Sequence, residues 1–252
     1  MVLHDHLKSL KPSDRVLEVG LGAKPHPRAE VCLDLRYSAD AESIKQHAFT
    51  SSRIDTSKTV LYDGGRFPFA DKEFDYVICS HVIEHVTPEE LPLFLSELER
   101  VAGRGYLEFP SVLYELIFLN DVHRWLLNCR GKRILLLEKG KIHSLSGPLQ
   151  KAYHALFFDT DRYMYNAFGR YPEVFFRGLE FQGRIDYEVV SDLSALFDDT
   201  DLAAARAYLT RFKDGGDLAV EKLRDRLAMK LAWAAMHPLA WLRGRAKGPR
   251  QG

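Results

Sequence analysis

Short, uninterrupted runs of apolar residues separated by polar segments dominate the first half of the chain. Runs rich in Val, Ile and Leu that show little alternation are typical of strands in a parallel sheet whose two faces are both covered. They predict five β-strands, at residues 15–20, 31–35, 59–62, 74–79 and 105–109.

A helical pattern lies between the last two of these strands. Residues 88–101 open with Pro and acidic residues, and Leu91, Phe94, Leu95 and Leu98 then recur at the spacing of one helix face. Strand–helix–strand units of this kind predict an α/β fold with a Rossmann-like, doubly wound, mostly parallel sheet.

The pattern changes after Pro110. Residues 123–129 and 133–138 flank Arg130-Gly131-Lys132, which favours a terminal antiparallel hairpin. Residues 140–190 are rich in aromatic side chains, and residues 202–242 are mostly of helical pattern. We therefore expect a first domain at 1–139, a cap or insertion over the sheet at 140–200, and a helical, basic C-terminal tail at 201–252.

Composition narrows the classes of partner and compartment. Lys plus Arg and Asp plus Glu are equal at 35 each, so no nucleic-acid partner is indicated. The N-terminal residues lack the apolar core of a secretory signal, and three scattered cysteines suit neither a disulfide framework nor a zinc site. These features favour the cytoplasm. The 252-residue chain is long enough for one α/β domain with additions.

Candidate ligand-binding residues follow the first two predicted strands. Glu18-Val-Gly20-Leu-Gly22 comes directly after the first strand, where glycines let backbone amides approach a ligand. Asp34 closes the second strand, a position from which a carboxylate can accept hydrogen bonds from ribose hydroxyls. Two glycines after a strand can also serve only a tight turn, and Asp34 can be a strand-end cap.

The segment from the third strand through the fourth carries the most specific pattern. It reads DGGRFPFADKEFDYVICSHVIEHV from Asp63 to Val86, and GYLEFPS follows at 105–111. In these motifs the chain resembles the class I S-adenosylmethionine-dependent methyltransferases, and among them the group called type 11. The resemblance covers about residues 14–139.

The resemblance implies S-adenosylmethionine as cofactor and gives roles to matching positions. Glu18, Gly20 and Gly22 would line the methionine part of the cofactor, and Asp34 would hold the ribose. Asp63 would meet the adenine amino group, although a strand-end cap is nearly as good an interpretation. Ser80 and His81 would border the site from the end of the fourth strand.

One departure from the family lies between the first two strands. Ala23-Lys24-Pro25-His26-Pro27-Arg28 stands where a third glycine and a helix are usual, and about ten residues are few for a helical crossover. We therefore expect no helix N-terminus to seat the cofactor carboxylate. Lys24 or Arg28 could supply the charge, or could be solvated loop residues.

His81-Val-Ile-Glu84-His85 matches a zinc-peptidase pattern, but that pattern requires a helix and a further ligand downstream. Because His81 falls where a strand ends, we expect no metal site here, and Glu84 and His85 are expected to begin the next helix.

Candidates for work on the methyl acceptor lie at the carboxyl ends of the fourth and fifth strands. His81 is the first choice as general base, because an imidazole of ordinary pKa, about 6.5, can take a proton at neutral pH. Glu108 is the second, because partial burial could raise its pKa. Further candidates to contact the acceptor are Ser111, Glu115 and His123. Aromatic side chains could wall the acceptor pocket or form the core of the cap (Tyr153, Tyr163, Tyr165, Phe168, Phe175 and Phe176).

These expectations describe an enzyme that methylates an oxygen or nitrogen of a non-protein acceptor, such as a glycan, a lipid-linked sugar or a small metabolite. Two rivals are a non-catalytic methyltransferase-like binding module and an NAD-linked Rossmann oxidoreductase, against which the missing G-x-G-x-x-G spacing argues. The segment from Glu221 on has eight basic residues and two acidic ones, and it includes the apolar stretch 231–242. This tail could contact a membrane surface, or pack on the cap or a second subunit.

Overall fold

The computed structural model describes residues 3, 6–20, 25–36, 58–118, 120, 122–141 and 171–214. The chain divides into two compact units, Met1–Asp199 and Thr200–Gly252, and the first contains every strand given below.

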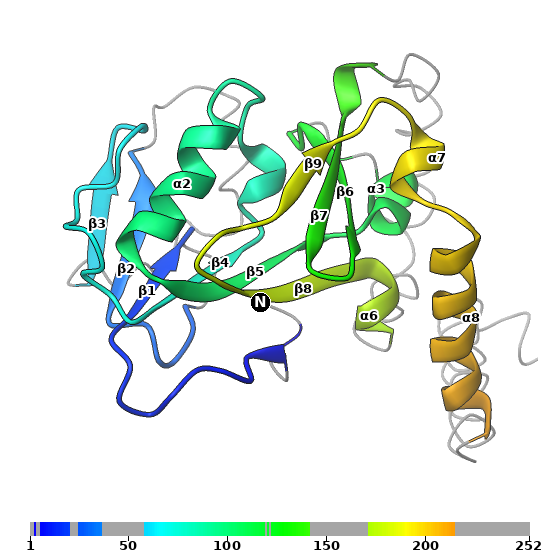
Figure 1. Ribbon diagram of the computed structural model, residues 1–252, viewed down its shortest axis with the longest axis horizontal. Coiled ribbons are helices and arrows are strands. Elements are labelled where there is room, and N and C mark those ends of the chain that lie inside the picture. The colour runs from blue at the N-terminus through cyan, green and yellow to red at the C-terminus, as the bar shows by residue number, and fades with distance from the viewer. Residues whose placement is uncertain are drawn as a thin grey trace, which may run out of the picture. The chain divides into compact units, whose positions relative to one another are not determined.

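A six-stranded sheet forms the centre of the first unit, in the order β3-β2-β1-β4-β5-β8 (Figure 1). Its first five strands are parallel and confirm the predicted ones, and the α/β, doubly wound fold class is confirmed with them. Their bounds are β1 Val16–Val19, β2 Val31–Leu35, β3 Thr59–Tyr62, β4 Tyr76–Ser80 and β5 Arg104–Pro110.

The antiparallel edge strand comes from a segment that the sequence assigns to the cap. It is β8, Phe176–Gln182, which pairs with β5 along its whole length. Gly178 is paired with Glu108, and the side chain of Tyr106 reaches over it, so that a Cβ at Gly178 would lie 2.1 Å from the tyrosine Oη. The close approach of β8 to β5 therefore depends on a glycine at this position.

The predicted hairpin forms, but it lies outside the main sheet. Strands β6 (Trp125–Arg130) and β7 (Arg133–Glu138) are antiparallel and join β9 (Tyr187–Val189) in a second sheet of order β6-β7-β9. Its apolar residues serve two clusters. Leu127, Ile134 and Leu136 pack into the main core, whereas Leu126, Leu135 and Leu137 pack with Val112, Val190 and Leu196. The hairpin is therefore an inner layer rather than the edge of the main sheet.

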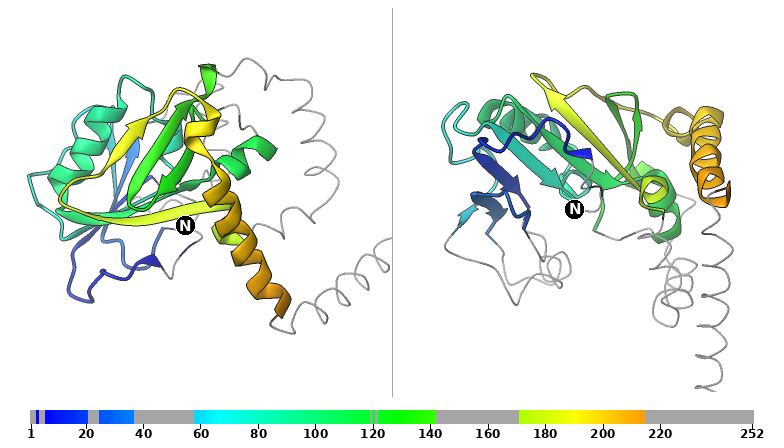
Figure 2. Two further views of the ribbon diagram at one scale, coloured as in Figure 1. Left: turned by 45° about the vertical axis from the view of Figure 1, so that its right-hand side comes forward. Right: turned by 90° about the horizontal axis from the view of Figure 1, so that it is seen from below.

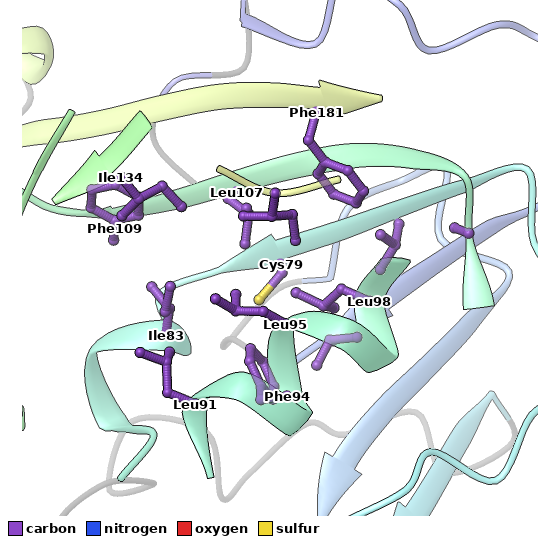
Figure 3. Packing of buried hydrophobic residues seen from close by; sticks show 14 of the residues in the cluster. Cys79, Ile83, Leu91, Phe94, Leu95, Leu98, Leu107, Phe109, Ile134 and Phe181 are labelled. Carbon is purple, nitrogen blue, oxygen red and sulfur yellow. The ribbon is translucent and has the colours of Figure 1, made fainter. Parts of the chain in front are cut away.

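The predicted helix is α2, Leu91–Val101, which lies along one face of the main sheet (Figure 2). Its apolar side chains pack against residues of β4, β5 and β8, as Figure 3 shows around Cys79, Leu107 and Phe181. The opposite face carries Val16, Tyr76, Ile78 and Tyr106, and the N-terminal segment covers them with Leu7 and Leu10. Both faces of the parallel strands are thus buried, as their apolar sequences require.

The connection from β1 to β2 contains no helix among its described residues, 25–30, in agreement with the two prolines there. Arg28 closes this connection onto the N-terminal segment. Its guanidinium donates to the backbone oxygens of Lys11, Pro12 and Asp14 at 3.2, 2.9 and 3.1 Å. The guanidinium of Arg28 is thus bound to the N-terminal segment, and Lys24 lies outside the described residues.

Six further helices complete the described part of the chain: η2 Ile83–His85, α3 Val112–Phe118, η3 Lys139–Lys141, α6 Pro172–Phe175, α7 Leu193–Leu196 and α8 Asp199–Asp214. α8 confirms the start of the predicted helical segment, whereas the apolar and basic stretch after residue 214 lies outside the described residues. None of the described helices is long and apolar enough to span a membrane.

Glu97 on α2 fastens the loop after β3 to this helix. Its buried carboxylate accepts the N–H of Phe67 at 2.7 Å and two bonds from Arg100, at 2.7 and 2.6 Å. Burial alone would raise the pKa of Glu97, but the bonds from Arg100 and Phe67 outweigh it and leave the pKa below its usual value.

We predict that Glu97→Gln lowers the free energy of unfolding at pH 7 by about 1.5–3 kcal/mol, the contribution of hydrogen bonds to a charged group. Because the folded pKa is lowered, this stabilisation is present above the ordinary carboxyl pKa of about 4.3 and is lost as the pH falls through the folded value. Denaturant unfolding at pH 7 and pH 3 measures both. The difference between variant and wild type should shrink at pH 3, and the exposed Glu89→Gln is the control. A difference that does not change with pH would contradict this account.

Candidate functional site

The parallel strands bring most of the predicted site residues to one edge of the sheet. Residues following β1, β2, β4 and β5 must lie at the same edge, since these strands all run in one direction. The strand order reverses between β1 and β4, and ligands of open α/β sheets bind outside the carboxyl ends at such a point.

Gly20 lies at this reversal, and two structural constraints require a glycine at this position. Its φ is +87°, a conformation that side chains disfavour, and its N–H donates to Leu33 O at 2.9 Å. A Cβ at this position would also lie 2.2 Å from Cγ2 of Val82. Gly20 thus lets the turn after β1 pack directly against the segment that follows β4. Gly22 lies outside the described residues.

Glu18 is buried near the end of β1. Its Oε2 accepts the N–H of His26 at 2.6 Å and holds the connection to β2 in place. Burial raises the pKa of Glu18, and the bond from His26 opposes that effect. The carboxylate is therefore both a support for the loop and an acceptor group at the carboxyl end of β1.

The two aspartates differ in their surroundings. Asp34 is buried at the end of β2, with Oδ1 accepting the N–H of Leu35 at 2.8 Å. Asp63, after β3, has a side chain 80% exposed, and its Oδ1 lies 2.9 Å from Nε of Arg36 in an ion pair. Asp34 therefore presents a fixed carboxylate, whereas Asp63 ties the ends of β2 and β3 together at the surface.

His81 adopts a strained backbone conformation directly after β4. Its φ is 58°, which is uncommon for a residue with a side chain and costs about 1–3 kcal/mol. The backbone N–H donates to Glu108 O at 2.8 Å, and the ring makes an edge contact with Phe176, with centroids 5.4 Å apart. Strain of this kind gathers at functional sites, and here it directs a half-exposed imidazole to the sheet edge.

Two carboxylates hold the His81 ring. Nδ1 lies 3.4 Å from Oε1 of Glu84 and Nε2 lies 3.2 Å from Oε1 of Glu108. Burial alone would lower the pKa of His81. The carboxylates of Glu108 and Glu84 outweigh this effect and raise the pKa to about 9. The expectation that this imidazole keeps its ordinary pKa is wrong, because the sequence does not show that two buried acids flank it.

Glu108 is completely buried and gathers several donors. Its Oε2 accepts the N–H of Leu3 at 2.8 Å and the hydroxyl of Tyr106 at 2.9 Å, and its Oε1 accepts the hydroxyl of Ser80 at 3.0 Å. A carboxylate so engaged is suited to orienting His81 rather than to taking a proton from an acceptor.

A second group of polar residues lies beyond His81. Glu84 and His85 form η2, a short 3-10 helix, and the backbone N–H of Arg124 donates to Glu84 O at 2.6 Å. This bond brings His123 against His85, with ring centroids 4.7 Å apart. Glu115, on α3, contacts both Nδ1 of His123 and Nζ of Lys139. The sequence did not indicate that these residues form one group. His85 and His123 are almost forty positions apart, and only the fold brings them together.

Other predicted acceptor residues take structural positions. The hydroxyl of Ser111 donates to Val174 O at 2.9 Å and its N–H to Phe175 O at 2.8 Å, so it fastens the segment before β8 to the end of β5. Phe176 contacts His81, as noted, and Phe175 packs beside it. The remaining aromatic candidates lie outside the described residues.

Comparison with known proteins gives one family match. Residues 21–107 match the family described as Methyltransferase domain. A search of curated proteins gave no match.

Solved structures also match. A protein from Pyrococcus horikoshii OT3 is 23% identical over 50% of this chain and 67% of its own, with a TM-score of 0.34. S-adenosylmethionine-dependent methyltransferases from Mesorhizobium loti and Methanosarcina mazei are 14% and 15% identical, with TM-scores of 0.29 and 0.31. They cover 49% and 52% of this chain, and 56% and 71% of theirs. Likeness at this level says nothing of the acceptor.

The matched segment contains β2, β3, β4 and the first part of β5, whereas Glu18 and Gly20 precede it and Glu108 follows it. The match shows that residues 21–107 are similar to methyltransferase domains, which confirms the resemblance found in the sequence. S-adenosylmethionine is the cofactor that this family implies. The residues fit it, because buried carboxylates end β1 and β2 and a glycine turn lies between them.

We predict that Gly20→Ala destabilises the fold by about 1–2 kcal/mol through its backbone and by a further ~1–3 kcal/mol through the contact with Val82. In a double-mutant cycle, Val82→Ala should relieve the second part and leave the first. Thermal or denaturant unfolding of the four proteins measures both parts. A Gly20→Ala variant as stable as the wild type would contradict the described turn.

Proposed function

We propose that this protein transfers a methyl group from S-adenosylmethionine to an oxygen or nitrogen of a non-protein acceptor. A glycan, a lipid-linked sugar or a small metabolite fits this class of acceptor. The observation that carries the proposal is the strained His81, whose ring lies at the carboxyl end of β4 beside the strand-order reversal.

The cofactor, when bound, supplies an electrophilic methyl group on a sulfonium. Glu18, Gly20 and Asp34 would bind it from β1 and β2, with Ser80 at the end of β4. Asp34 would accept bonds from hydroxyls of the ribose, and Asp63 would meet the adenine from the exposed side. Methyl transfer is an in-line displacement, so the protein contributes mainly position, exclusion of water and the removal of a proton.

His81 and Glu108 are the proposed residues on the acceptor side. His81 is 31% exposed and can contact an acceptor, whereas Glu108 is buried. We therefore assign the contact with the acceptor to His81 and treat Glu108 as the positioning residue that fixes its ring. Because the pKa of His81 is raised to about 9, only the neutral fraction of the imidazole can take a proton from the acceptor, and that fraction grows as the pH rises toward 9.

The two rivals make different predictions. A non-catalytic binding module would keep the cofactor site and show no turnover with any acceptor. An NAD-linked oxidoreductase would bind NAD instead of S-adenosylhomocysteine, which the family match to residues 21–107 opposes.

Compartment and partners belong to the same proposal. The free cysteines Cys32, Cys79 and Cys129 suit the reducing cytoplasm. The basic residues after Glu221 would allow peripheral contact with anionic lipid, close to a lipid-linked acceptor, and packing of the tail on the cap or a second subunit is the alternative. Balanced total charge favours a small molecule or glycan over nucleic acid.

We predict that the protein binds S-adenosylhomocysteine at micromolar strength and that Asp34→Ala weakens binding by ~1–3 kcal/mol, through loss of charge-assisted hydrogen bonds. Isothermal titration calorimetry measures both proteins, with NAD as a second titrant. Asp186→Ala, at an exposed ion pair on the second sheet, is the control and should bind like the wild type.

Unchanged affinity in Asp34→Ala would remove this residue from the site. A folded wild type that binds NAD but not S-adenosylhomocysteine would overturn the proposed function.

For the acceptor side, we predict that His81→Ala lowers kcat by ~10²–10⁴ and leaves the affinity for S-adenosylhomocysteine nearly intact. His81→Asn is the companion variant, because Asn tolerates the positive φ. Glu108→Gln keeps the size of the side chain and should lower kcat more than it raises KM, since it loosens the ring. Steady-state kinetics with an identified acceptor separate these effects. Wild-type kcat in both His81 variants would show that this assignment is wrong.

A further inference from the structure

Glu84 is the feature that the proposed reaction leaves unexplained. Its side chain is completely buried, and neither carboxylate oxygen has a hydrogen-bond partner. Nδ1 of His81 lies 3.4 Å from Oε1 of Glu84, but the two atoms do not have the geometry of a hydrogen bond. Among the residues that the structure describes, Glu84 forms no ion pair with a lysine or arginine. The charge of His81 offsets part of the cost of burying this carboxylate, but its oxygens still lack the hydrogen-bond donors that replace lost water.

Two imidazoles stand beside this carboxylate. Glu84, His85 and His123 each offer one ligand atom, and these atoms lie within 4.8 Å of one another. Two histidines and one glutamate are a ligand set that divalent zinc and its first-row neighbours accept. Because Zn–N and Zn–O distances are about 2.0–2.2 Å, the side chains would close around an ion by small rotations.

In both histidines, the ring nitrogen that would face away from the ion has the kind of partner that metal-bound histidines usually have. Nδ1 of His85 lies 3.3 Å from Val122 O, and a carbonyl only accepts, so this nitrogen carries the proton. Nδ1 of His123 faces the carboxylate of Glu115, which Lys139 Nζ neutralises at 3.1 Å. Contacts of this kind fix the tautomer and direct the lone pair of Nε2 toward an ion.

One contact must give way. Nδ2 of Asn120 lies 3.1 Å from Nε2 of His123, where the ion would bind. The carboxamide can rotate, since its Oδ1 makes only a long bond, 3.3 Å, with the N–H of Val122. Removing this amide should therefore favour metal binding rather than weaken it.

We propose that Glu84, His85 and His123 bind one divalent transition-metal ion, such as zinc, beside the methyl-acceptor side of the sheet edge. The sequence predicted no metal because His81 falls where a strand ends, and the proposed site does not use His81 but joins Glu84 and His85 to His123. We therefore replace that expectation. With three protein ligands, the ion keeps a position for water or for an oxygen of the acceptor.

The test uses the full chain purified without a metal-affinity tag and stripped with a chelator. Isothermal titration with Zn²⁺ should show saturable binding of one ion per chain, and Mg²⁺ should bind much more weakly because it prefers oxygen ligands. Glu84→Gln and His123→Ala should each weaken Zn²⁺ binding by at least about tenfold, and Glu115→Gln by ~10–100-fold. Asn120→Ala should bind at least as tightly as the wild type.

Two matched controls lie away from the cluster. Glu89→Gln and His6→Ala make the same kinds of substitution at solvent-accessible positions and should bind Zn²⁺ like the wild type. Circular dichroism confirms that each variant is folded. Substitution with Co²⁺ gives a second readout, since its visible spectrum reports nitrogen ligands and should be lost in His123→Ala.

The proposal is overturned if the folded wild type shows no saturable binding of Zn²⁺ or Co²⁺. It is equally overturned if Glu84→Gln and His123→Ala both bind like the wild type. If His123→Ala does not fold, Glu84→Gln decides, because it preserves shape and removes only the charge. No cofactor or acceptor enters these measurements, so they are independent of the proposed methyl transfer.

Discussion

The carboxylate of Glu108 is the interaction on which the sheet edge depends. It lies at the carboxyl end of β5 without access to water, and it joins three parts of the chain that are distant in sequence. Leu3 brings the N-terminal segment, Ser80 and His81 bring the end of β4, and Tyr106 belongs to β5 itself. A buried charge is tolerated only when its lone pairs are satisfied, so these segments are obliged to meet here.

The strain at His81 follows from this arrangement. A residue with a positive φ persists only where its surroundings over-determine it. The backbone bond to Glu108 O, the two flanking carboxylates and the edge contact with Phe176 provide that restraint. The same restraint turns the chain sharply after β4, which lets Val82 pack on Gly20 and gives Glu84 its buried place. The turn after β4 therefore connects the positions of Gly20, His81 and Glu84.

Much of this could be predicted from sequence, because parallel strands and α2 depend on local pattern. The strands β1 to β5 and the residues that end them, Gly20, Asp34 and His81, follow directly from apolar runs and turn residues.

What escaped prediction depends on long-range pairing. The aromatic segment before residue 190 hides β8, whose pairing with β5 needs Gly178 against Tyr106. The hairpin was recognised, but its place as an inner layer was not, because its two apolar faces are visible only once both clusters are known. The raised pKa of His81 and the contact of His85 with His123 likewise arise from segments that only the fold brings together.

The central claim is that S-adenosylmethionine binds at the carboxyl ends of β1, β2 and β4. Hydrogen–deuterium exchange, followed by mass spectrometry with and without S-adenosylhomocysteine, tests where the ligand binds without prior choice of a residue. The account predicts slowed exchange in peptides that contain Glu18 to Gly20, Asp34 and Ser80 to His85, with the second sheet, β6-β7-β9, unchanged. Protection confined to the second sheet, or no protection at saturating ligand, would contradict it.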